Sequence, residues 1–230
     1  MKKIVCIIPA RGGSKGLKLK NVRLLNKKPL IYYPIDYAQK SNIKMDIFVS
    51  TDSARIASVA KKFGADVPFL RKKKYSLDHT TTEETLKNAL LEYEDYKKIK
   101  YDYCIFLTAT DIFRDKKWIL LGLKKILNDK KLESVFVGYK THKNFWQKNA
   151  NNKWQRLKGW MARYESRQTR RHIVREDTGL FSISKANLWR KGIRIGNNID
   201  IIEHEDDFSF IDIHNEKDLK TANLILKKFK

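Results

Sequence analysis

Short apolar runs alternate with amphipathic segments along this chain, and the alternation predicts an α/β domain with a mainly parallel sheet. The apolar runs are the expected strands, and they cover residues 3–8, 46–50, 103–107, 134–138 and 180–183. The first run reads Ile-Val-Cys-Ile-Ile after Lys3 and is expected to be a buried strand.

Helices are predicted where apolar residues recur every three or four positions. One stripe runs from Ile56 to Phe63, with a start signal at Asp52 or Ser53 and a stop signal at Gly64. Two further stripes have the same spacing: Leu86, Ala89, Leu90 and Tyr93, and then Leu219, Ala222, Leu226 and Phe229.

Residues 139–171 break this rhythm, because they are rich in Lys, Arg, Asn, Gln and Trp. Trp146, Trp154 and Trp160 are spaced too irregularly for a core helix. Large aromatic side chains are costly to leave in water, and unstructured loops of this length are uncommon. We therefore expect residues 1–230 to form a single domain in which residues 139–171 are an insertion, either folded back or packed on a second subunit.

The apolar runs are far too short to cross a membrane, and the opening stretch is too short for a secretion signal. Cys6 and Cys104 lie inside apolar segments, where a reduced cysteine behaves as a small hydrophobic residue. Two buried thiols without a secretion signal predict a cytoplasmic protein.

The formal net charge of +23 raises the question of nucleic acid as a partner. The lysines are scattered over loops and helix ends, however, and no predicted helix carries a basic face interleaved with aromatic residues. This pattern favours a solvated surface over a groove for a polyanion. A positive field also suits triphosphate and carboxylate substrates.

A glycine-rich loop follows the first predicted strand, where residues 9–16 read Pro-Ala-Arg-Gly-Gly-Ser-Lys-Gly. Glycines let backbone N–H groups approach an anion, while Arg11, Lys15 and Lys20 can neutralise phosphate charge. The spacing matches neither the P-loop nor the dinucleotide GxGxxG pattern. The loop therefore predicts phosphate binding of another kind.

Residues 8–16, followed by Lys20-Asn21, resemble the opening motif of the acylneuraminate cytidylyltransferases. The resemblance implies a Rossmann-like nucleotidyltransferase fold of the glycosyltransferase-A type, in which this loop wraps the triphosphate of CTP. The implied nucleotide contacts are Arg11, Gly12, Gly13, Ser14 and Asn21, and Lys15 is implied to bind phosphate and to be catalytic.

Two further segments resemble the family. Residues 49–65 match a strand that leads into a helix, although Thr-Asp-Ser at residues 51–53 is also an ordinary helix cap. Arg71, Thr80 and Thr82 stand where the family binds the cytidine. Residues 80–82 can also begin the next helix, with Glu83 and Glu84 in its first turn, and both roles are compatible.

The chain departs from the family at residues 108–114, which read Thr-Ala-Thr-Asp-Ile-Phe-Arg in place of Gln-Pro-Thr-Ser-Pro-Leu-Arg. The family's Gln position is implied to contact substrate, so Thr108 is the candidate acceptor contact here. The added carboxylate of Asp111 would either repel an acidic sugar or bind a metal.

Arg167-Gln168 resembles a family pair whose arginine is implied to be catalytic, with Gln168 and Arg175 as candidate contacts to the acidic sugar. An arginine suits negative charge that develops on phosphorus or on leaving pyrophosphate, because it stays protonated and binds pairs of oxygens. The alternative is that these arginines are ordinary surface charge.

Residues 210–219 resemble a family segment in which paired aspartates hold Mg²⁺. Asp212 keeps the first position, but His214 occupies the second, and imidazole is a poor magnesium ligand. Asp212 would then work with water, CTP phosphates or another carboxylate such as Asp111. A structural role for Asp212 is the alternative.

The implied function is transfer of CMP from CTP to the anomeric hydroxyl of a sialic-acid-like nonulosonic sugar, with Mg²⁺ as cofactor and pyrophosphate as product. Family members are commonly homodimers, and residues 139–171 could reach over the partner's sugar site. The alternatives are an enzyme of the CMP-Kdo type, a modified ulosonic acid as acceptor, and a non-catalytic relative that binds polyanions. No membrane or nucleic-acid partner is expected.

Overall fold

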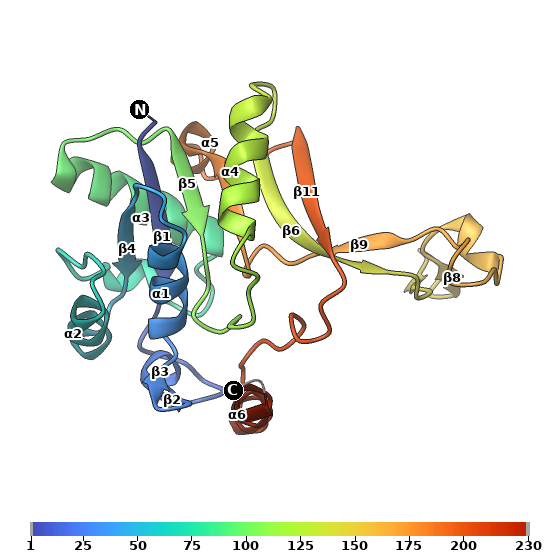
Figure 1. Ribbon diagram of the computed structural model, residues 1–230, viewed down its shortest axis with the longest axis horizontal. Helices are drawn as coiled ribbons and strands as arrows, with labels where there is room; N and C mark the ends of the chain where they lie inside the picture. The colour runs from blue at the N-terminus through green and yellow to red at the C-terminus, as the bar shows by residue number, and fades with distance from the viewer. Residues whose placement is uncertain (1, 229–230) are drawn as a thin grey trace.

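The computed structural model describes residues 2–228, so Phe229, the end of the last predicted stripe, lies outside the described residues. The central sheet has the strand order β11-β6-β10-β5-β1-β4, and β9 pairs with β6 beside this path (Figure 1). The strands are β1 (Ile4–Pro9), β4 (Asp46–Ser50), β5 (Tyr103–Phe106), β6 (Ser134–Thr141), β9 (Ile173–Glu176), β10 (Ser182–Lys185) and β11 (Ile199–His204).

Pairing is parallel between β4, β1 and β5 and between β6 and β11. β10 is antiparallel to β5 and β6, and β9 is antiparallel to β6. The predicted mainly parallel α/β sheet is therefore confirmed.

Helices cover both faces of the sheet. Those on one face are α1 (Tyr32–Lys40), α2 (Ala54–Lys62) and α4 (Trp118–Asn128), and those on the other are α3 (Thr82–Lys97) and α5 (Ala186–Arg190). Along β1, Cys6 and Ile8 join the first of these cores, while Val5 and Ile7 join the second. A strand buried on both faces requires a continuous apolar run, as the sequence indicated.

The predicted stripes of α2 and α3 are confirmed, including Ser53 as the residue that caps α2. The predicted strand at residues 180–183 is wrong in its bounds, because β10 begins only at Ser182. The physical reason is that the Arg114 guanidinium takes the carbonyls of Gly179 and Leu180 as acceptors, at 3.1 and 2.6 Å. The Gly179 carbonyl also accepts the backbone N–H of Thr108 at 3.0 Å, so this segment is held to the residues after β5 before β10 begins.

A small separate core lies below the sheet and contains Leu17, Leu25, Ile213 and Leu219. It joins the end of the glycine-rich loop to the hairpin of β2 (Leu24–Leu25) and β3 (Lys28–Pro29) and to α6 (Glu216–Lys228), whereas Val22 of the short 3-10 turn η1 (Lys20–Val22) packs against the core that contains Cys6 and Ile8. A Cβ atom built on Gly16 would lie 2.6 Å from the backbone oxygen of His214. This close approach brings residues 212–214 against the loop.

Residues 142–172, which we call the arm, project away from the sheet (Figure 1). The arm contains the hairpin of β7 (Trp146–Lys148) and β8 (Trp154–Arg156) and the 3-10 turn η3 (Gly159–Ala162). Trp146 and Trp154 are 48% and 66% exposed, while Met161 is buried. The arm therefore has its own secondary structure and does not fold back over the sheet.

The root of the arm is a ribbon in which β9 pairs with β6 over Gly138–Thr141. A Cβ atom on Gly138 would lie 2.3 Å from Val174 Cγ1 and 2.9 Å from the backbone oxygen of Arg175. Only glycine allows the strands to come this close. Within residues 2–228, no helix has the length and apolarity needed to cross a membrane.

Candidate functional site

Two cavities adjoin at the carboxyl ends of β1 and β5, and both are lined by Pro9 and Arg11. The first, the Arg71 cavity, has a volume of about 310 Å³. The second, the Lys20 cavity, has a volume of about 330 Å³. Ligands of open α/β sheets bind at this edge, where the strand order reverses.

Most of the predicted nucleotide residues line these cavities. In the Arg71 cavity they are Arg11, Arg71, Thr80 and Thr82. In the Lys20 cavity they are Arg11, Ser14, Lys15 and Asn21, and the predicted acceptor contact Thr108 lines the same cavity. The fold thus brings together segments that are separated by up to about a hundred residues, because the strands that carry them end at the same edge.

The glycine-rich loop is fixed from two sides. The backbone N–H of Gly12 donates to Asp52 Oδ1 at 2.7 Å, and the amide of Asn21 donates to the carbonyl of Arg11 at 2.9 Å. A Cβ on Gly12 would meet Ser53 Cβ at 3.0 Å, whereas a Cβ on Gly13 would meet nothing within 4 Å. Gly12 therefore packs against α2.

Asp52 has a role that the sequence did not reveal. The helix cap is Ser53, whose hydroxyl accepts from the backbone of Ile56 at 3.4 Å. Asp52 instead accepts the N–H of Gly12 and so ties the loop to the end of β4. The Thr-Asp-Ser segment is both a helix cap and a support for the loop.

The Arg71 cavity is bounded by the start of α3 and the 3-10 turn η2 (Lys73–Tyr75). Arg71 is 6% exposed and donates from Nε to Ser76 Oγ at 3.0 Å. Burial lowers the pKa of Arg71 from its ordinary value, and the carboxylate of Asp52 partly offsets this effect. Thr81 caps α3 with a capping box, so the predicted helix start is confirmed while Thr80 and Thr82 also line the cavity.

The cations of the loop are held by acidic groups. Asp78 pairs with Arg11 at 2.9 Å and with Lys15 at 2.6 Å. Burial lowers the pKa of Lys20, and the carboxylates of Asp212 and Asp111 counteract that effect. Lys20 thus stands between the loop and an acidic pair.

That acidic pair is Asp111 and Asp212, whose backbones form an isolated antiparallel bridge. Asp111 accepts from the Thr108 hydroxyl, and its pKa is raised by burial and by the neighbouring Asp212. His214 Nε2 lies 2.8 Å from Asp212 Oδ2, while Asp212 Oδ1 is buried without a hydrogen-bond partner.

The donor set fits a hard divalent ion such as Mg²⁺, which prefers carboxylate oxygens and keeps several waters or phosphate oxygens. Asp212 Oδ1 has no hydrogen-bond partner and could therefore bind an ion, and Asp111 lies opposite Asp212 in the isolated backbone bridge. Residues 2–228 contain no group of three or more His, Cys, Asp and Glu side chains that could enclose a metal. Any bound Mg²⁺ would therefore depend on substrate oxygens for the remaining ligands.

Arg114 is a structural support that the sequence did not identify. It is partly buried, and its Nη2 donates to the carbonyls of Thr108 and Gly179 at 2.7 and 3.1 Å. These carbonyls belong to the segments that follow β5 and precede β10. Arg114 therefore fixes the floor on which Thr108 and Asp111 lie.

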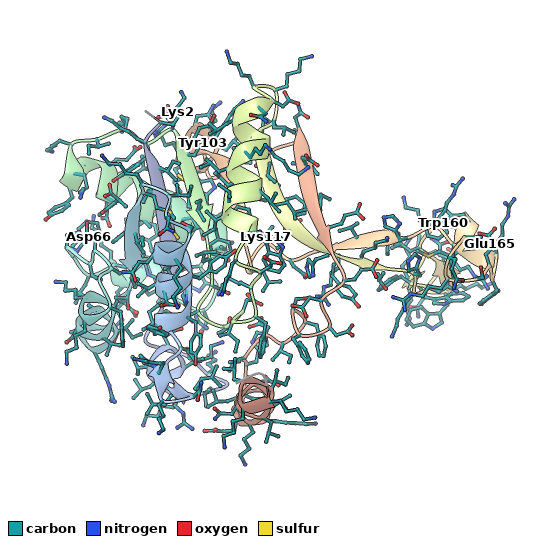
Figure 2. The ribbon with its side chains drawn as sticks, viewed as in Figure 1. Lys2, Asp66, Tyr103, Lys117, Trp160 and Glu165 are labelled. Carbon is teal, nitrogen blue, oxygen red and sulfur yellow. The ribbon has the colours of Figure 1, made fainter. Side chains whose placement is uncertain are left out.

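The predicted acceptor and catalytic residues of the arm lie apart from both cavities. Arg167 is exposed and contacts Glu205 at 3.6 Å, and Gln168 is exposed beside it. Arg175 pairs through two nitrogens with Asp177, at 2.7 and 2.9 Å. Figure 2 shows Trp160 and Glu165 at the far end of the arm.

Comparisons with known proteins agree with this geometry. The family model described as "Cytidylyltransferase" matches residues 5–226. A CMP-N,N'-diacetyllegionaminic acid synthase of Campylobacter jejuni is 44% identical over 110 residues, which are 48% of this chain and 47% of that protein. An N-acylneuraminate cytidylyltransferase of Escherichia coli is 38% identical over 122 residues, 53% of this chain and 28% of that protein.

The chain thus spans half or less of the length of these two relatives. In the solved structures, a CMP-2-keto-3-deoxy-manno-octonic acid synthetase complexed with CTP superposes with a TM-score of 0.70 at 14% identity, covering 100% of both chains. At that identity the superposition shows the fold alone. The family match and the curated relatives together confirm the resemblance read from the motifs: this chain belongs to the cytidylyltransferase family, in its acylneuraminate type.

Proposed function

We propose that this protein transfers a cytidylyl group from CTP to the anomeric hydroxyl of a nonulosonic acid and releases pyrophosphate. The observation that carries the proposal is the pair of cavities joined at Arg11, one beside Arg71 and the threonines of α3, the other beside Lys15 and Lys20. The first suits cytidine and the second suits phosphates.

The chemistry follows from charge and position. Loop amides with Arg11, Lys15 and Lys20 neutralise the triphosphate, and the sugar hydroxyl attacks the α-phosphorus in line while pyrophosphate leaves. Such reactions need little covalent chemistry from the protein, since orientation and electrostatic stabilisation lower most of the barrier. Arg114 contributes by fixing the backbone beneath the acceptor side.

Asp212 and Asp111 would hold Mg²⁺, which when bound neutralises phosphate charge as the leaving group departs. The buried free oxygen of Asp212 supports this role. His214 donates from Nε2 to the carboxylate of Asp212 and is better suited to orient that carboxylate than to ligate the ion.

The nature of the acceptor is supported by the relatives. The names of both curated relatives specify a nonulosonic acid or a CMP-activated form of one, which favours that class over the eight-carbon Kdo. The likeness to the Kdo enzyme is one of fold. Thr108 in place of a glutamine, with Asp111 beside it, marks the position where this chain's acceptor contacts differ from the family motif.

A homodimer is the third part of the proposal. Arg167 and Gln168 lie on the arm and do not line the cavities of their own chain. A second copy could place its arm over the cleft that the Arg71 and Lys20 cavities form, and so supply Arg167 and Gln168 to it. The exposed rings of Trp146 and Trp154 provide apolar area for that contact. With both cysteines buried and unpaired, the cytoplasm is the proposed location.

The test is pyrophosphate release from CTP and Mg²⁺ with a panel of acceptors: sialic, legionaminic and pseudaminic acids, and Kdo. We expect release with one of the nine-carbon acids and none with Kdo. Release with Kdo alone would assign the enzyme to the other class. Absence of both release and CTP binding would refute the proposal.

The shared site is tested by mixing two inactive variants, Arg11→Ala and Arg167→Ala. In a mixed dimer, one cleft retains both residues, so part of the activity should return. A mixture as inactive as either variant, in a sample that is shown to be dimeric, would contradict the shared site.

A further inference from the structure

Asp78 holds the two loop cations that the proposed function assigns to the triphosphate. Its Oδ1 lies 2.9 Å from Arg11 Nη1, and its Oδ2 lies 2.6 Å from Lys15 Nζ. Each carboxylate oxygen therefore serves one cation. The two oxygens of a carboxylate imitate two oxygens of one phosphate, because both are close-set acceptors of charge-assisted hydrogen bonds.

The segment that carries Asp78 belongs to the nucleotide cleft. It lies between η2 and α3, and Asp78 lines the Arg71 cavity together with Thr80 and Thr82. Arg11 lines both cavities. Asp78 thus lines the Arg71 cavity and also contacts Lys15, which lines the Lys20 cavity.

These contacts have the character of exchangeable ion pairs. The exposed side-chain fractions are 36% for Arg11, 77% for Lys15 and 50% for Asp78. Exposed pairs contribute little to stability and are readily replaced by other charged groups. The pKa of the Asp78 carboxyl lies below its ordinary value, chiefly because Lys15 donates to it, so the group stays charged at neutral pH.

We propose that Asp78 is a resident anion of the triphosphate subsite, which is displaced by CTP and returns to Arg11 and Lys15 as pyrophosphate leaves. The proposal rests on the proposed function, since it requires that Arg11 and Lys15 bind phosphate. Every ligand that uses both cations must compete with Asp78. A ligand without phosphates has no such competition.

The inference predicts a selective effect of the Asp78→Asn substitution, which keeps the shape and removes the charge. Pyrophosphate should bind to the variant roughly two- to tenfold more tightly than to the wild type, since two exposed ion pairs no longer compete. Cytidine affinity should change less than pyrophosphate affinity, because cytidine has no phosphate to compete with Asp78 for Arg11 and Lys15, although Asp78 lines the same cavity. Pyrophosphate should also become a stronger product inhibitor of the reaction.

The experiment is titration calorimetry of the full chain with pyrophosphate and with cytidine. Asp95→Asn is the matched control, because it removes an exposed carboxylate on α3 that pairs with Lys98 at 2.7 Å, outside both cavities. Asp78→Ser is a second variant that removes the charge by another route and should act in the same direction. Thermal unfolding checks that all variants are folded.

Three results would be decisive. Tighter pyrophosphate binding in both Asp78 variants, with Asp95→Asn like the wild type, supports the inference. Equal or weaker pyrophosphate binding in a folded Asp78 variant, with the wild type still binding CTP, overturns it and leaves the proposed function standing. A wild type that binds neither CTP nor pyrophosphate overturns both.

Discussion

The cleft and the arm are built on opposite principles. The cleft, formed by the Arg71 and Lys20 cavities, lies at the edge of a sheet that is buried on both faces. Its loops are fixed by hydrogen bonds that Asn21 and Arg114 donate and by one that Asp52 accepts. In the arm, cations lie over exposed rings instead, with the Arg156 guanidinium 4.5 Å from the ring centre of Trp146. In the proposed function, the nucleotide half of the site is therefore complete within one chain.

The acceptor half is not complete in the same way. Arg167 and Gln168 extend from the arm beyond the reach of either cavity's lining. Under the proposed homodimer, the residues of one reaction would come from two chains. Variants in the two regions should then fail in different ways.

The largest effect is expected for Lys15→Ala, in the cleft. Loss of a cation that stabilises charge on the leaving phosphates should lower kcat/KM about 10²- to 10³-fold. Steady-state pyrophosphate release measures this loss. Lys62→Ala, at the exposed end of α2, is the matched control and should behave like the wild type.

A somewhat smaller effect is expected for Arg167→Ala, in the arm. We expect kcat to fall about 10²-fold because charge on the transition state loses a partner. CTP affinity should stay within about twofold, because the cation lies apart from the nucleotide cavities. Arg55→Ala, exposed on α2, serves as the control; a large loss of CTP affinity in Arg167→Ala would remove the distinction between the two regions.

Substitutions in the helices that cover the sheet should lower the free energy of unfolding more than substitutions in the arm do. Glu94→Gln, on α3, tests this. Glu94 is buried on α3, where it accepts from Arg190, Lys100 and the backbone N–H of Tyr101. Removing its charge leaves the partly buried guanidinium of Arg190 and the buried N–H of Tyr101 poorly paired and should cost about 2–4 kcal/mol of unfolding free energy. Urea denaturation at pH 7 measures the loss.

The same carboxylate gives the protein an acid-sensitive component of stability. Burial alone would raise the pKa of Glu94, but the hydrogen bonds outweigh it and hold the pKa below 4.5. Its contribution is thus fully present above about pH 4.5 and is lost as pH falls through the lower pKa of the folded state. The difference between wild type and Glu94→Gln should shrink in that range, and a constant difference down to pH 3 would contradict it.

The smallest effect on folding is expected for Trp154→Ser. The ring is 66% exposed at the arm hairpin, so the unfolding free energy should change by no more than about 0.5 kcal/mol. If the arm forms the dimer contact, sedimentation should nevertheless show weaker self-association. Leu224→Ser, an exposed apolar residue on α6, is the control for nonspecific loss of surface area.

The strands of the sheet centre could be predicted because burial on both faces requires unbroken apolar runs. The elements that the sequence analysis missed include α1, α4 and β11. The apolar residues of α4 begin Trp-Ile-Leu-Leu, without a clear helical period, and α1 carries Pro34 near its start. In β11 charged residues interrupt the apolar ones, as is common at the edge of a sheet.

Motif residues of the cleft could be predicted because their local patterns are distinctive. Their supports could not, since each depends on a partner far along the chain. Asp52 holds a loop forty residues earlier, Asp78 pairs with cations more than sixty residues away, and Arg114 reaches a carbonyl sixty-five residues later. Such contacts exist only once the sheet has brought the segments together.

The root of the arm has a mechanical consequence. β6, which lies beside the edge strand β11, runs without a break to the start of the arm, and at Gly138 it is flanked by both β9 and β11. A hydrogen-bonded pair of strands resists bending far more than a single connecting segment does. The arm should therefore rotate together with the sheet domain and should not move independently of it. A fluorophore at Asn151 would then report the slow rotation of the whole molecule, and two such arms in a dimer would set a fixed spacing between the two clefts.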